Sequence, residues 1–229
     1  MARTRTPGRL EHILEAGAQL FIAKGYRLTR IADVAAQAGV APATVHLYTA
    51  TKPSLFDLAI RRELRDPTVR NEPLPYHAPS PRACVDRIWQ RLLANADFPV
   101  LRSITHVVPP QGADAELRDI AREAYRWLGD HRRAIMIIER CADDWPELAS
   151  LFALQFRREF LHRLTAFIDR RARQGVLRRT PDAAIAARVM LESITYFAVR
   201  RHETLENSMN VALAEEVVLD MIGAALHPA

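Results

Sequence analysis

Cysteine is scarce in this chain. Cys84 and Cys141 are the only two cysteines in 229 residues, and no Cys-x-x-Cys pair is present. This excludes a disulfide framework and a cysteine-rich zinc site. We expect both thiols to be small, buried, hydrophobic side chains.

Long apolar runs are also missing. The densest candidate, residues 183–199, is interrupted by Arg188 and Glu192, and no segment reaches the roughly 18 apolar residues that a bilayer span requires. The basic N-terminus is not followed by the apolar region of a secretory signal. We therefore expect a cytoplasmic protein with no membrane partner.

Signatures of catalysis and metal binding are absent as well. The sequence has no P-loop, Gly-x-Ser-x-Gly, Gly-x-Gly-x-x-Gly or kinase pattern. Its eight histidines form no His-x₃-His or His-Glu-x-x-His pair, the spacings that suit zinc. The sequence predicts no catalytic residue, no metal site and no cofactor. An all-α enzyme stays open as an alternative, but it would need a catalytic constellation within residues 82–229.

The charge of the chain is concentrated near its beginning. The formal net charge is +5, and residues 1–66 hold ten basic and six acidic residues, a local excess of four. Hydrophobic residues make up 49% and charged residues 26%, which are values typical of a globular protein. A basic first quarter permits a polyanionic partner such as DNA.

The sequence pattern near Gly39 predicts a helix-turn-helix. Two short helices, residues 30–38 and 42–48, are expected on either side of a turn at residues 39–41. Gly39 supplies the positive φ that such a turn needs, and Pro42 suits the first position of a helix. Thr29 is a plausible cap for the first of these helices, and Gly17 in the preceding helix permits close approach of a neighbour.

Helical spacing of apolar residues continues along nearly the whole chain, so the predicted fold class is all-α. Five prolines within residues 66–81 cannot form a regular helix and indicate a semi-rigid linker. The expected organisation is a flexible basic arm (1–8), a helix-turn-helix DNA-binding domain (9–50), a linking helix (51–66), a proline-rich linker (67–81) and a larger helical domain (82–229).

The segment GYRLTRIADVAAQAGVAPATVHLY, residues 25–48, resembles the DNA-binding domain of the TetR family of bacterial transcriptional regulators. The segment TKPSLF, residues 51–56, is similar to the start of that family's fourth helix. The resemblance covers residues 9–60 without gaps. It departs from the family pattern at Ala41, His46, Thr49 and Pro53, which bears on the operator sequence.

The resemblance implies residue roles. Thr29 and Arg30 begin the second helix and would hold phosphates, and Lys52 would meet the phosphate backbone. Positions of the third helix would enter the major groove, where hydroxyl, imidazole and methyl groups can contact base edges. The implied DNA-binding residues are Thr29, Arg30, Pro42, Ala43, Thr44, His46, Tyr48 and Lys52. Arg3 and Arg5 could extend this contact from a disordered arm or simply be solvated.

The larger domain is expected to bind a small-molecule effector and to form a homodimer through residues 181–226. Apolar residues at helical spacing near the C-terminus support a covered face, either between two subunits or within one. Such an effector pocket would be mainly apolar, and the candidates for its wall are Trp89, Trp127, Phe156, Phe160 and Tyr196. The resemblance implies a repressor released from a palindromic operator by this ligand; a DNA-binding protein without an effector is the other alternative.

Overall fold

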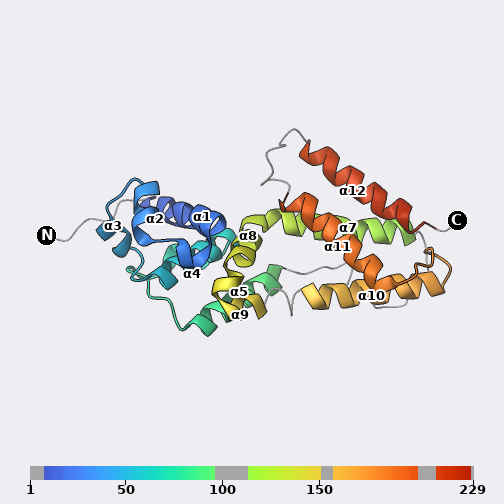
Figure 1. Cartoon of the computed structure of the whole chain (residues 1–229), viewed down its shortest axis with the longest axis horizontal. Coiled ribbons are helices and arrows are strands. Elements are labelled where there is room, and N and C mark those ends of the chain that lie inside the picture. The colour runs from blue at the N-terminus through green and yellow to red at the C-terminus, as the bar shows by residue number, and fades with distance from the viewer. Residues whose placement is uncertain (1–7, 96–112, 151–156, 201–209, 228–229) are drawn as a thin grey trace. The chain divides into compact units, whose positions relative to one another are not determined.

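Helices and turns make up the parts of the chain that the computed structural model describes, residues 8–95, 113–150, 157–200 and 210–227 (Figure 1). No strand occurs in these ranges, which agrees with the predicted all-α class. The helices form two compact units. The first contains α1 to α5 with α8 and α9, and the second contains α7, α10, α11 and α12.

The first unit begins with the three helices of the expected helix-turn-helix bundle. They are α1 (Arg9–Leu28), α2 (Ile31–Gln37) and α3 (Pro42–His46). Gly25 breaks the helical geometry near the end of α1 with a φ of 78°, and Gly39 turns the chain between α2 and α3 with a φ of 66°. The sequence suggested Thr29 as the cap of α2, but the N-cap residue is Arg30, which makes no side-chain capping bond.

Helix α4 (Lys52–Glu63) is held against α1. Thr51 caps α4 by accepting a hydrogen bond from the Ser54 amide. A Cβ atom at Gly17 would lie 3.3 Å from Leu55 Cδ1, so the predicted close approach at Gly17 is confirmed, with α4 as the neighbour. The residues from Ser54 to Arg61 are all buried, which makes α4 the centre of the first unit.

The first unit extends past the domain boundary that the sequence suggested at residue 81. Helices α5 (Pro81–Asn95), α8 (Arg132–Cys141) and α9 (Pro146–Ala149) belong to it. Aromatic packing contributes to this, since the centroid of the Trp145 ring, just before α9, lies 4.9 Å from that of Phe56 and 5.2 Å from that of Tyr26. Helix α5 contacts α4 and α9. Two 3₁₀ turns, η1 (Pro67–Asn71) and η2 (Ala142–Asp144), complete the unit.

The second unit packs α7 (Ala113–Asp130) against α11 (Ala183–Ala198) and α12 (Val211–Ala225), and α10 (Arg157–Arg173) against α11. Helix α7 ends at Asp130, and α10 ends just before Gly175, which has a φ of 75°. Asp182 caps the start of α11, because its carboxylate accepts hydrogen bonds from the amides of residues 184 and 185. Within the described ranges, none of the helices could cross a membrane.

Candidate functional site

Helix α3 is short, and its side chains divide between two environments. Pro42, Ala43 and His46 are exposed, Thr44 is half-buried, and Val45 is fully buried. A five-residue helix is not stable by itself, so Val45 and the packing of α3 on α2 determine its position. The result is a small surface that presents polar and methyl groups on a fixed frame.

The imidazole of His46 has one defined partner. Its Nδ1 atom lies 3.3 Å from the carbonyl oxygen of Ala50. A carbonyl only accepts, so this hydrogen bond places the proton on Nδ1 and leaves Nε2 of the neutral ring as an acceptor. The exposed edge of His46 is therefore suited to an amino group.

Two of the predicted contact residues are not at the surface. Thr29 is 1% exposed, and its hydroxyl donates to the carbonyl oxygen of Gly25 at 2.7 Å. Tyr48 is 3% exposed. The sequence alone could not predict whether the hydroxyls at these positions face solvent or the protein interior, because burial depends on how the whole unit packs.

The predicted cations lie at helix starts. Arg30 is exposed where α2 begins. Lys52 begins α4, and its ammonium group donates to the Arg27 carbonyl oxygen at 3.1 Å. Burial lowers the pKa of Lys52, and the nearby Asp144 carboxylate opposes that shift. Arg27 itself is paired with Asp144, at 3.4 Å.

Residues 13–59 match the family model described as bacterial regulatory proteins, tetR family. This segment of the chain therefore carries the DNA-binding domain of the TetR family of bacterial regulators. The chain is a DNA-binding transcriptional regulator. The match begins at Ile13 on α1 and ends at Ala59 on α4, so it contains every predicted DNA-contacting residue.

Solved structures with the same fold span almost the whole regulator. The ketosteroid transcriptional regulator KstR2 of Mycobacterium tuberculosis is 14% identical, with a TM-score of 0.61 and 98% of each chain covered. AibR in complex with isovaleryl coenzyme A and operator DNA is 17% identical, with a TM-score of 0.54 and coverage of 96% of this chain and 98% of AibR. A TetR-like transcriptional regulator from Rhodococcus sp. RHA1 is 16% identical, with a TM-score of 0.52 and 97% of each chain covered. No curated protein has a sequence that matches the chain.

Four of the five residues predicted to line an effector pocket are described by the structure, and they are divided between the two units. Trp89 is half-buried in the first unit, whereas Trp127 and Phe160 are buried in the second. Tyr196 is 45% exposed on α11. Phe156 lies outside the described residues, as do Arg3 and Arg5 of the expected arm.

The second unit of the regulator carries a groove elsewhere. Its volume is about 480 Å³, and it lies between α11 and α12. The side chains around it are largely apolar and include Ile185, Val189, Phe197, Val218 and Met221. None of the four described candidates lines it. The helical spacing of these apolar residues was visible in the sequence, where it predicted a subunit interface.

The other reactive groups are buried. Burial raises the pKa of Cys84 to about 12 and that of Cys141 to about 12. Both thiols are buried, as the sequence predicted. In the described part of the chain, no group of three or more His, Cys, Asp or Glu side chains could hold a metal ion.

Proposed function

We propose that this regulator is a homodimeric repressor that reads a palindromic operator with α3 and releases it when a small molecule binds the second unit. The observation that carries this proposal is the division of α3 into a buried anchor, Val45, and an exposed set, Pro42, Ala43 and His46. A helix held in this way can lie in the major groove.

Each exposed side chain has a plausible partner on DNA. The Ala43 methyl group can contact a thymine methyl group, and the free Nε2 of His46 can accept a hydrogen bond from the amino group of adenine or cytosine. Thr44 can bond a phosphate or a base edge. Arg30 and Lys52 can bind phosphates at helix starts, where backbone amides add positive potential.

The buried residues Thr29 and Tyr48 act differently in this proposal. Thr29 ties the end of α1 to the start of α2 through its bond to Gly25. Tyr48 is buried directly after the C-cap of α3. Both support the surface that reads DNA and do not touch it.

Dimerisation is supported by an exposed apolar stripe on α11 and α12, which we call the C-terminal stripe. Within each helix its members are four or seven residues apart, which is the spacing of one helix face. They are Ile185 (65% exposed), Val189 (60%), Tyr196 (45%), Leu213 (55%), Val217 (47%) and Met221 (67%). Contiguous apolar surface of this kind marks an interaction site. A second copy of the chain would pack its own α11 and α12 there, by a symmetric contact.

Release by a ligand follows from the two-unit architecture. A small molecule that favours one arrangement of the dimer weakens DNA binding, and DNA weakens ligand binding by the same coupling free energy. AibR, a protein of the same fold, has been solved in complex with isovaleryl coenzyme A and operator DNA. We place this function in the cytoplasm, where the operator is accessible.

The proposal is tested by selecting bound duplexes from sheared genomic DNA at physiological salt, which suppresses nonspecific phosphate contacts. Recovery of a palindromic site supports a repressor, and a protein-free metabolite extract should then release that site in a gel shift. Recovery of a site that no extract releases favours the effector-independent alternative. Recovery of no preferred sequence contradicts the proposal.

A single substitution in α3 checks which surface reads the DNA. His46→Ala should weaken binding to the selected duplex by about 1–3 kcal/mol and relax selectivity at one base pair of each half-site. His162→Ala is the matched control, because His162 is an exposed histidine on α10 of the second unit. Tyr48 is left unchanged in this test, since it is buried and its replacement would also disturb the fold.

A further inference from the structure

The proline-rich segment after α4 returns to the helix-turn-helix. Residues 66–78, which we call the strap, contain η1 and then pass beside the end of α3. The Tyr76 amide donates to the Tyr48 carbonyl oxygen at 2.8 Å, and the Ala50 amide donates to the Tyr76 carbonyl oxygen at 2.9 Å. These bonds form an isolated parallel bridge between Thr49 and Tyr76. The strap is therefore a structural partner of α3 and does more than link two domains.

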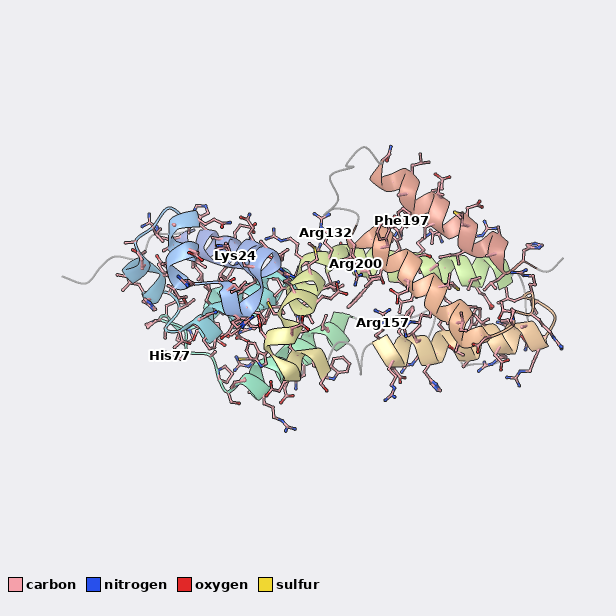
Figure 2. All side chains as sticks on the ribbon, in the orientation of Figure 1. Lys24, His77, Arg132, Arg157, Phe197 and Arg200 are labelled. Atoms are coloured by element: carbon pink, nitrogen blue, oxygen red, sulfur yellow. The ribbon has the colours of Figure 1, made fainter. Side chains whose placement is uncertain are left out.

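The side chain of Tyr76 points the other way, into the first unit. Tyr76 is 3% exposed, and its hydroxyl donates to the Asp57 carboxylate of α4. The same hydroxyl accepts a hydrogen bond from Arg87 of α5 at 2.9 Å. The adjacent His77, labelled in Figure 2, is exposed, which agrees with the alternation of an extended segment.

Arg61 of α4 anchors the rest of the strap. Its guanidinium group donates to Asp66 at 2.8 Å, to Thr68 at 2.7 Å and to Glu72 at 2.7 Å. Arg61 is 3% exposed, so these bonds are shielded from water. Hydrogen bonds to a charged group in such a setting are stronger than neutral ones.

Tyr76 thus contacts the segment just after α3 with its main chain and contacts α4 and α5 with its side chain. Its main chain holds the three residues that follow the C-cap of α3, and its hydroxyl is held by α4 and α5. Helix α3 is too short to keep its own orientation. Base readout depends on hydrogen-bond geometry, which weakens steeply as donor and acceptor move out of line.

We infer that Tyr76 is a positioning residue for the recognition helix, and that the strap couples the orientation of α3 to α4 and α5. The inference rests on the proposed use of α3 to read DNA. Loosening the hydroxyl end of Tyr76 should reduce selectivity for the operator, whereas phosphate contacts, which tolerate small shifts, should remain.

The test uses the full-length Tyr76→Phe variant, the duplex that the wild-type protein selects, and an unrelated duplex of the same length. We expect the ratio of selected to unrelated affinity to fall about tenfold, because the hydrogen bonds that join the Tyr76 hydroxyl to Asp57 and Arg87 are lost. Amide exchange at Ala50 should become faster, while exchange within α1 is unchanged. Tyr125→Phe is the matched control: Tyr125 is a buried tyrosine of the second unit whose hydroxyl donates to the Phe197 carbonyl oxygen at 3.4 Å.

An unchanged ratio in a folded Tyr76→Phe variant would overturn the inference, as would an equal loss of affinity for both duplexes. If the wild-type protein selects no duplex, the proposed function fails first and the inference falls with it. If Tyr76→Phe does not fold, Arg87→Met decides by the same criteria, with Arg82→Met as its control on α5. Because Arg87 is half-exposed, Arg87→Met should lower the ratio of selected to unrelated affinity only two- to fivefold.

Discussion

The ammonium group of Lys52 lies 4.4 Å from the centre of the Tyr26 ring and 3.1 Å from the carbonyl oxygen of Arg27. Both contacts join the start of α4 to the end of α1. They orient a cation that is still partly exposed, at a helix start that favours anions. This geometry suits a phosphate of the DNA backbone.

Lys52→Gln should therefore weaken binding to the selected duplex and to unrelated DNA by the same factor. The slope of log affinity against log salt should become shallower by about 0.9, as for one lost phosphate contact. A salt titration by fluorescence anisotropy measures both quantities. Arg173→Gln, which removes an exposed cation from α10, should change neither. A loss confined to the selected duplex would show that Lys52 reads bases.

The C-terminal stripe predicts the oligomeric state. Met221 is 67% exposed at the edge of the groove between α11 and α12. Met221→Asp should shift the protein from dimer to monomer, because the new carboxylate would be buried without a partner in the interface. Sedimentation at several concentrations measures this shift. Leu28→Asp, which places the same charge on an exposed apolar side chain of the first unit, should leave the dimer intact. A wild-type protein that sediments as a monomer would contradict the proposed interface.

Two glycines with open space around them, one in the turn before α3 and one in α7, predict stability changes of opposite sign. Gly39 has a φ of 66°, and a Cβ atom there would contact nothing within 4 Å. Gly39→Ala should therefore lower the free energy of unfolding by about 1–2 kcal/mol through backbone strain alone. Gly129 lies in α7, also with open space and without a positive φ. Gly129→Ala should raise the free energy of unfolding by up to about 1 kcal/mol. Denaturant titration of both variants tests the pair, and a loss at both positions would refute the argument.

The strap predicts a dependence of stability on acid. Burial alone would raise the pKa of Asp66, but hydrogen bonds from Arg61 and Thr68 outweigh it and lower that pKa. A carboxylate with a lowered folded-state pKa stabilises the protein above its unfolded value, and the effect is lost as pH falls through the folded value. Asp66→Asn should therefore cost about 1–2 kcal/mol at pH 7, and the difference from wild type should shrink below about pH 4.

Urea titrations across this pH range measure the effect of Asp66→Asn. Asp169→Asn is the control, because Asp169 pairs with Arg173 on an exposed surface where such a pair contributes little. A difference that persists unchanged into acid would mean that the charge of Asp66 is not what stabilises the strap.

Local patterns predicted the helix-turn-helix well, because its signals act over a few residues. Gly39 and Pro42 stand where a turn and a helix start require them, and the family match at residues 13–59 falls inside the predicted range. The surface of α3 was less predictable. Thr29 and Tyr48 carry hydroxyls that could face either way, and both are buried.

The sequence by itself determined the fold class, the helix-turn-helix and the apolar spacing of α11 and α12, since each follows from neighbours within one or two helical turns. Tertiary structure alone decided which side chains in and next to α3 are exposed and which are buried. The burial of Tyr48 and the docking of Tyr76 depend on the strap, which joins residues 26 to 28 positions apart. It also decided that α5, α8 and α9 belong to the first unit, where Trp145 packs on Phe56 across 89 positions of sequence and α5 packs on α4 and α9. Contacts of this range depend on the packing of the whole unit, and no local period in the chain encodes them.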